Sequence, residues 1–123
     1  MAHKSETRWV LKSRRTGKYR AKGLVAMNKP RHSFTLANFR NQKAYVCGGA
    51  NDREILNIVE RFDFTTRKWE SVPCMTVARR NPSSCCLNSS LYVMCGTGYT
   101  YSNLNSIDKF TNNKWLNIMI PVS

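Results

Sequence analysis

The feature that most constrains this chain is an internal repeat with a period of 48 residues. Shifting the sequence by 48 positions places Cys95 on Cys47 and Gly96 on Gly48. Other identities or close chemical matches in this register are Arg31 with Arg79, Leu56 with Leu104, Glu60 with Asp108, Arg61 with Lys109 and Phe62 with Phe110. Trp115 also matches Trp69 once the turn before it is shortened by two residues. Matches spread over a whole unit predict two copies of one structural element.

Each unit divides into four short segments with the composition of β-strands. These segments are residues 33–39, 43–49, 56–64 and 67–72 in the first unit, and 83–88, 90–96, 104–110 and 113–118 in the second. The stretches between them carry the turn formers Gly, Asn, Asp, Ser and Thr. Apolar residues at the three–four spacing of a helix are absent over any ten positions. Four strands in a unit of nearly fifty residues are typical of a β-propeller blade, so we expect an all-β fold of four-stranded antiparallel blades.

The strand that ends in two glycines, followed by an aromatic residue with Asp and then by Trp, resembles the kelch repeat. The resemblance covers roughly residues 27–119. In the first unit its pattern positions are Gly48, Gly49, Phe62, Asp63 and Trp69, with phenylalanine in place of the usual tyrosine. The second unit keeps Gly96, Phe110 and Trp115, but Thr97 stands where the second glycine is expected and Thr111 where the aspartate is expected.

Most of these residues are expected to be architectural. Glycine allows a backbone conformation or a close approach that a Cβ would block. The two tryptophans, together with Phe62, Phe110, Ile58 and Ile107, are expected to fill the layer between neighbouring sheets. Arg31 and Arg79 open the first strand of each unit, and we expect them to hydrogen-bond backbone carbonyls near the glycines.

The repeat predicts three parts: a basic N-terminal segment (1–26), a first kelch repeat (27–75) and a second (76–123). Residues 15–19 resemble the turn that ends in Trp69, with Tyr19 in the tryptophan's place. Residues 9–25 are therefore either half of a degenerate earlier blade or part of a disordered basic arm. A closed propeller needs four to eight blades, so two blades plus a half blade predict an incomplete propeller. The alternatives are a piece or short member of a longer kelch protein, a ring of several copies, or blades docked on another protein.

The resemblance implies a non-catalytic protein–protein interaction module that acts as a scaffold or adaptor. Kelch partners are gripped by loops on one face, which correspond here to residues 50–55, 99–103 and the link 73–79. The candidate partner-binding residues are Asn51, Asp52, Arg53, Tyr99 and Tyr101, a polar and aromatic mixture that suits protein interfaces.

Charge supports an alternative function. Residues 1–43 contain twelve Lys or Arg and one Glu, a net charge of +11, whereas residues 44–123 contain eight basic and six acidic residues, a net charge of +2. Trp9 and Tyr19 are interleaved with basic residues in the first region. Basic side chains can neutralise phosphates while aromatic rings stack on bases, so the alternative is binding of RNA or another polyanion by this segment.

Nothing in the sequence indicates an enzyme, a cofactor site, a metal site or a membrane span. The two histidines, His3 and His32, stand apart from the five cysteines, and neither a CxxC pair nor a GxSxG, P-loop or HExxH motif occurs. Adjacent Cys85 and Cys86 are expected on opposite faces of a strand. We expect the cysteines to be buried free thiols in a reducing compartment, which predicts a cytoplasmic protein.

Overall fold

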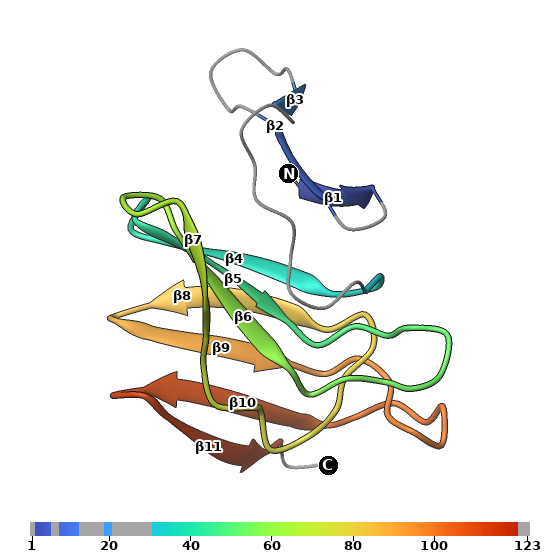
Figure 1. Cartoon of the computed structure of the whole chain (residues 1–123). Coiled ribbons are helices and arrows are strands. Elements are labelled where there is room, and N and C mark those ends of the chain that lie inside the picture. The colour runs from blue at the N-terminus through green and yellow to red at the C-terminus, as the bar shows by residue number, and fades with distance from the viewer. Residues whose placement is uncertain (1, 6–7, 13–18, 21–30, 121–123) are drawn as a thin grey trace.

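The computed structural model describes residues 2–5, 8–12, 19–20 and 31–120, with side chains described from Arg31 onward. All regular elements in these ranges are β-strands, and Figure 1 shows them arranged as separate sheets. The first four-stranded sheet, blade 1, consists of β4 (Thr35–Phe39), β5 (Lys43–Cys47), β6 (Val59–Asp63) and β7 (Lys68–Ser71). The second, blade 2, consists of β8 (Ser83–Leu87), β9 (Ser90–Met94), β10 (Ser106–Thr111) and β11 (Lys114–Met119). Each sheet is antiparallel, and strands that follow one another in the sequence are adjacent in the sheet. The predicted fold class is therefore confirmed.

A smaller antiparallel sheet precedes the blades. It consists of β1 (Ala2–Ser5), β2 (Arg8–Lys12) and β3 (Tyr19–Arg20) in that order. Part of the predicted half blade lies outside the described residues, so its assignment, like the boundaries of the two repeats, stays a prediction.

The two blades meet face to face and are joined at their first strands. The Thr35 and Ser84 hydroxyls, on β4 and β8, are 2.7 Å apart. The core between the sheets consists of Ala37, Tyr45, Cys47, Val59, Met75, Leu91, Val93 and Phe110. Trp115 packs against this core, and its Nε1 donates a hydrogen bond of 2.7 Å to the Pro73 carbonyl in the link after blade 1.

The aromatic pair of blade 1 lies on the equivalent face of its own sheet. Phe62 and Trp69 stack edge to face at 5.1 Å, and Trp69 packs with Val46 on the side of β5 opposite the core between the blades. The expectation for Ile107 was wrong. Strand residues alternate between faces, and Ile107 lies an odd number of positions from Phe110, so it is on the other side of β10.

The structure corrects the register of the repeat at the glycines. An added Cβ would lie 2.5 Å from the His32 carbonyl at Gly49 and 2.5 Å from the Arg80 carbonyl at Gly96. Gly96 is therefore the equivalent of Gly49, not of Gly48, and Cys95 takes the place of Gly48. Cys95 has a φ of 61° against 68° for Gly48, so a residue with a side chain holds the left-handed conformation there.

The cause is a pair of compensating length differences. The turn between β8 and β9 (residues 88–89) is one residue shorter than the turn between β4 and β5 (residues 40–42). The following loop is one residue longer, because Thr97 pairs with Asn103 whereas Ala50 pairs with Ile55. The period is therefore 47 along β9 and 48 again from Leu104 to Phe110, and Thr97 does not occupy a glycine position.

Arg31 and Arg79 form the same buried junction in the two blades. Arg31 Nη1 donates to the Gly48 and Ile58 carbonyls at 3.1 and 2.7 Å, and its Nη2 bonds Glu60 at 2.6 Å. Arg79 Nη1 donates to the Cys95 and Ser106 carbonyls at 3.0 Å each, and its Nη2 bonds Asp108 at 3.2 Å. The carbonyl contacts are those expected from the sequence. The carboxylate partners were missed, although the repeat matched Glu60 with Asp108.

The expectation of five buried thiols was wrong. All five cysteines are free, but only Cys47 is buried, while Cys74 and Cys85 are exposed. Burial raises the pKa of the Cys47 thiol well above its usual range and also raises that of Cys86. Cys85 is exposed and Cys86 packs toward the core between the blades, as expected for opposite faces of β8.

The part of the chain that the structure describes contains no helix of the length and apolar character needed to cross a bilayer.

Candidate functional site

Two loops at the same end of the sheets enclose a cavity of about 360 Å³, the loop cavity. The loops connect β5 to β6 and β9 to β10, and they extend from one edge of the molecule in Figure 1. The lining residues are His32, Ala50, Asn51, Asp52, Arg53, Glu54, Ile55, Arg80, Tyr99 and Tyr101. All five residues that the sequence singled out as partner-binding candidates therefore lie around one cavity.

The first loop is held in shape by its own side chain and backbone. Asn51 Oδ1 accepts hydrogen bonds of 2.9 Å from the backbone N–H groups of both Arg53 and Glu54, and the Asn51 N–H donates to the Glu54 carbonyl. Such an Asx turn fixes the backbone locally. The Asn51 side-chain oxygen thus stabilises the loop, while Asp52, Arg53 and Glu54 are exposed on it.

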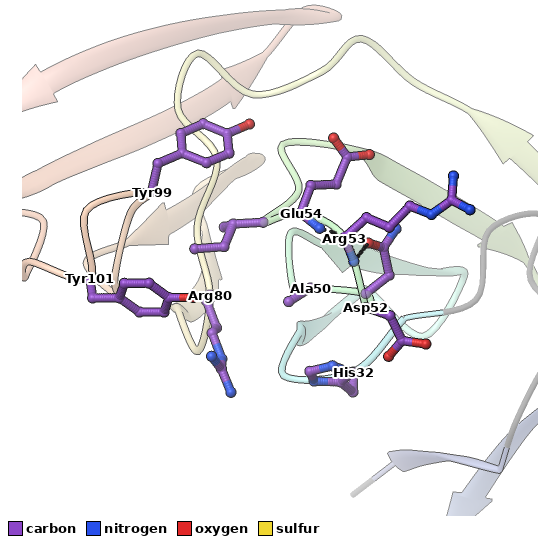
Figure 2. A pocket seen from close by; sticks show the side chains of 10 residues that line it. His32, Ala50, Asp52, Arg53, Glu54, Arg80, Tyr99 and Tyr101 are labelled. Carbon is purple, nitrogen blue, oxygen red and sulfur yellow. Dashed lines mark hydrogen bonds between the residues drawn. The ribbon is translucent and has the colours of Figure 1, made fainter.

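The second loop presents two tyrosines to solvent. Tyr99 and Tyr101 are 66% and 74% exposed. The Tyr101 N–H donates to the Gly98 carbonyl at 2.9 Å, and Tyr101 adopts a φ of 60°. In Figure 2 the two rings lie on one side of the cavity and the labelled residues of the first loop on the other. Exposed tyrosines on a hydrogen-bonded loop offer large contact area at small entropic cost.

Arg80 and His32 were missed by the sequence analysis. Each follows the buried junction arginine of its blade. Through its backbone, His32 pairs with Ala50, the residue after Gly49, and Arg80 pairs with Thr97, the residue after Gly96. The repeat could have indicated both residues, because it aligns position 32 with position 80. The Arg80 Nε is buried and has no hydrogen-bond partner in the described part of the chain.

The predicted third contribution to this face, the link 73–79, does not line the cavity. Met75, Ala78 and Arg79 of this link are buried, because they connect the two sheets. Only Arg80, immediately after the link, reaches the cavity.

The lining combines two arginines, two carboxylates, two phenols and one imidazole. This mixture can donate to and accept from a polar peptide and can pack on apolar side chains. Among the described residues, no three His, Cys, Asp or Glu side chains are grouped so that they could hold a metal ion.

The Kelch motif family model matches residues 31–76, which include all of blade 1 and its junction arginine. This segment is a kelch repeat, and the chain is similar to kelch-repeat proteins. Blade 2 repeats the strand order and the buried arginine–carboxylate pair of the matched segment. Kelch repeats generally mediate protein–protein interactions and are generally not catalytic.

Viral kelch proteins are among the relatives. The Kelch repeat protein C2 of vaccinia virus (strain Western Reserve), of cowpox virus (strain GRI-90 / Grishak) and of camelpox virus (strain CMS) is in each case 32% identical over 77 residues. The alignment covers 60% of this chain and 15% of each relative. The chain therefore spans about 15% of the length of these curated relatives.

Proposed function

We propose that this kelch-repeat chain is a non-catalytic scaffold or adaptor that binds a partner protein at the loop cavity. The observation that carries the proposal is the convergence of two equivalent loops of the repeat on one cavity, with exposed tyrosines and a partly buried arginine in its wall. The five free cysteines support a reducing, cytoplasmic setting for this interaction.

Arg80 indicates the chemistry of the partner. A buried donor without an acceptor costs free energy, and a carboxylate would satisfy it with a charge-assisted hydrogen bond. Tyr99 and Tyr101 flank this position with apolar ring surface and phenol groups. We therefore expect the partner to present an exposed segment in which an Asp or Glu is close to an apolar residue.

The test is quantitative capture of partners with the tagged full chain and two variants, Arg80→Gln and Tyr99→Ala/Tyr101→Ala. Central aromatic and arginine residues of an interface typically account for about 2 kcal/mol or more each, so captured partners should fall by roughly 30-fold. Lys114→Ala, an exposed change at the first residue of β11, is the matched control and should leave capture unchanged. Partners retained at wild-type levels by both cavity variants would contradict the proposal.

A further inference from the structure

A second cavity, the turn cavity, lies between the two blades at the end opposite the loop cavity. Its volume is about 190 Å³. The short turns of both blades lie at this end, and in Figure 1 they are on the opposite side of the sheets from the two loops. The two cavities share no lining residue, so the turn cavity is a separate candidate site.

Aromatic rings form the floor of the turn cavity. Phe39 and Tyr45 of blade 1 meet edge to face with their ring centroids 6.3 Å apart, and Tyr45 meets Phe110 of blade 2 at 6.0 Å. Aromatic rings favour such contacts with a further ring. A cavity of about 150 Å³ lined by apolar side chains can bind benzene. The turn cavity is therefore large enough for one aromatic side chain.

Blade 1 indicates which group fits on this floor. Phe64 is two positions after Phe62 and packs edge to face on its ring at 5.6 Å. Phe62 and Phe110 occupy equivalent positions of the two repeats. The residue two positions after Phe110 is Asn112, which lines the turn cavity. The cavity thus lies where a ring at position 112 would pack, and blade 2 does not supply that ring.

The reason is the length of the turn. The turn between β6 and β7, residues 64–67, has four residues, whereas the turn between β10 and β11, residues 112–113, has two. Asn112 and Asn113 have φ angles of 51° and 62°, as a two-residue type I′ turn requires. Asparagine adopts this conformation far more readily than a bulky side chain does. The short turn therefore leaves the space beside Phe110 open.

The surface around the turn cavity is basic. The two turns of blade 1 at this end, residues 40–43 and 63–68, contain four basic residues and one acidic residue, a net charge of +3. The acidic residue, Asp63, accepts hydrogen bonds from two backbone N–H groups of its own turn and is 3.3 Å from the Nζ of Lys43. This surface therefore favours a partner that carries negative charge.

Two arginines of blade 1 bring this charge to the cavity itself. Arg61 is part of the wall, where its Nη1 donates to the Tyr45 hydroxyl at 3.4 Å and its Nε and Nη2 donate to Glu70. Arg40 is exposed, and its Nη2 donates at 2.5 Å to the hydroxyl of Ser89, another wall residue. A carboxylate at the mouth of the cavity can accept charge-assisted hydrogen bonds there.

We infer that the turn cavity binds an aromatic side chain of a partner protein, a phenylalanine or tyrosine that is flanked by Asp or Glu residues. The ring packs on Phe110 as Phe64 packs on Phe62, and the neighbouring carboxylates face Arg40 and Arg61. This site is additional to the loop cavity and does not depend on the function proposed there.

The probe is the fluorescein-labelled peptide Glu-Asp-Tyr-Glu-Asp, and fluorescence anisotropy measures its binding. All comparisons use the full chain with Arg80→Gln/Tyr99→Ala/Tyr101→Ala, because the loop cavity is also expected to accept an acidic segment. In this background the tyrosine peptide should bind, and the peptide with alanine in place of tyrosine should bind more weakly by about tenfold or more, because it lacks the buried ring. Arg40→Gln should weaken binding of the tyrosine peptide about threefold.

A turn graft tests the place of binding. Residues 111–113 are replaced by a copy of residues 63–67, so that the copied Phe64 fills the turn cavity as the original covers Phe62. The graft should bind the tyrosine peptide more weakly by about tenfold or more. The matched control has Phe64→Ala in the copied turn alone. It keeps the same turn length without the ring, and it should recover the affinity that the graft loses.

Three outcomes would overturn the inference. The first is equal binding of the tyrosine and alanine peptides, and the second is equal binding of the tyrosine peptide by the graft and by its control. The third is binding that occurs in the original chain and is lost in the Arg80→Gln/Tyr99→Ala/Tyr101→Ala background, which would assign the peptide to the loop cavity. Binding that is insensitive to Arg40→Gln would contradict the flanking carboxylates.

Discussion

At the residue scale, the buried arginine–carboxylate pairs are the groups with the least freedom to change. Arg79 and Asp108 are both fully buried, and the Arg79 Nε also donates to Asp108 at 3.3 Å. The arrangement differs in blade 1, where the Arg31 Nε is buried without an acceptor among the described residues. Each arginine donates to backbone carbonyls at the end of one strand and to a carboxylate on the next strand. Each arginine therefore links these two strands.

Arg79→Met should therefore be strongly destabilising. It leaves the Asp108 carboxylate buried without its ion pair, and breaking such a pair typically costs about 3–5 kcal/mol. Urea unfolding of the variant measures the loss, and Arg79→Met/Asp108→Leu, which removes both charges, should recover part of it. A cost below about 1 kcal/mol for the single change would show that the pair does not stabilise the junction.

At the scale of strands, blade 1 carries a charge network that blade 2 lacks. Glu70 on β7 accepts from Arg61 on β6 at 3.2 Å and is 3.2 Å from the Nζ of Lys43 on β5. The hydrogen bonds from Arg61 lower the pKa of the Glu70 carboxyl, with a further contribution from Lys43. In blade 2 the place of Glu70 is taken by Leu116, opposite Lys109.

The network should make stability depend on acid pH. A carboxyl whose pKa is lower in the folded state stabilises the fold at pH values above its pKa in the unfolded state, about 4.3. This stabilisation is lost as the pH falls through its pKa in the folded state. Glu70→Gln should thus cost about 0.5 kcal/mol at pH 7, since the pair is partly exposed, and nothing at pH 2. Urea unfolding at both pH values measures this. Leu116→Gln, at the equivalent position, is the control, and a Glu70→Gln effect that is equal at both pH values would contradict the prediction.

At the scale of the whole molecule, the charge is concentrated at one end of the chain. Residues 1–43 carry +11 of the net charge of +13. The side chains of the first thirty residues lie outside the described ones, so polyanion binding by this segment stays a prediction. The described blades from residue 44 onward are nearly balanced and offer no comparable source of affinity for phosphates.

If the N-terminal segment binds RNA, its affinity should depend steeply on salt. With about six phosphates neutralised, binding of a single-stranded oligonucleotide should fall by about 300-fold between 50 and 200 mM salt. Changing Lys12, Arg14, Arg15 and Lys18 to Gln in the full chain should abolish binding, measured by fluorescence anisotropy. Lys109→Gln/Lys114→Gln, on blade 2, is the control. Binding that persists in the fourfold variant would reject the N-terminal segment as the site.

The sequence predicted the strands but not the differences in turn and loop length between the two repeats. Period, turn residues and strand alternation are local properties, so four strands per unit and an all-β fold follow from them directly. A single shift of 48 residues cannot detect a turn that is shorter by one residue when the next loop is longer by one, and it matched Gly96 to Gly48 rather than to Gly49. The sequence also could not predict which thiols are buried, because the exposure of Cys85 depends on whether another sheet covers that face of β8.

The candidate site divides in the same way. The kelch resemblance indicated the loops, and their polar and aromatic composition then selected Asn51, Asp52, Arg53 and the two tyrosines as residues of binding character. Only the tertiary structure brought both loops around one cavity, placed Arg80 in its wall and engaged the Asn51 oxygen within the loop. By itself the sequence determined the repeating unit, because strand and turn preferences act over a few residues. The packing of one sheet on the next decided which equivalent positions are buried, which are exposed and which meet across the cavity, because these depend on contacts between residues tens of positions apart.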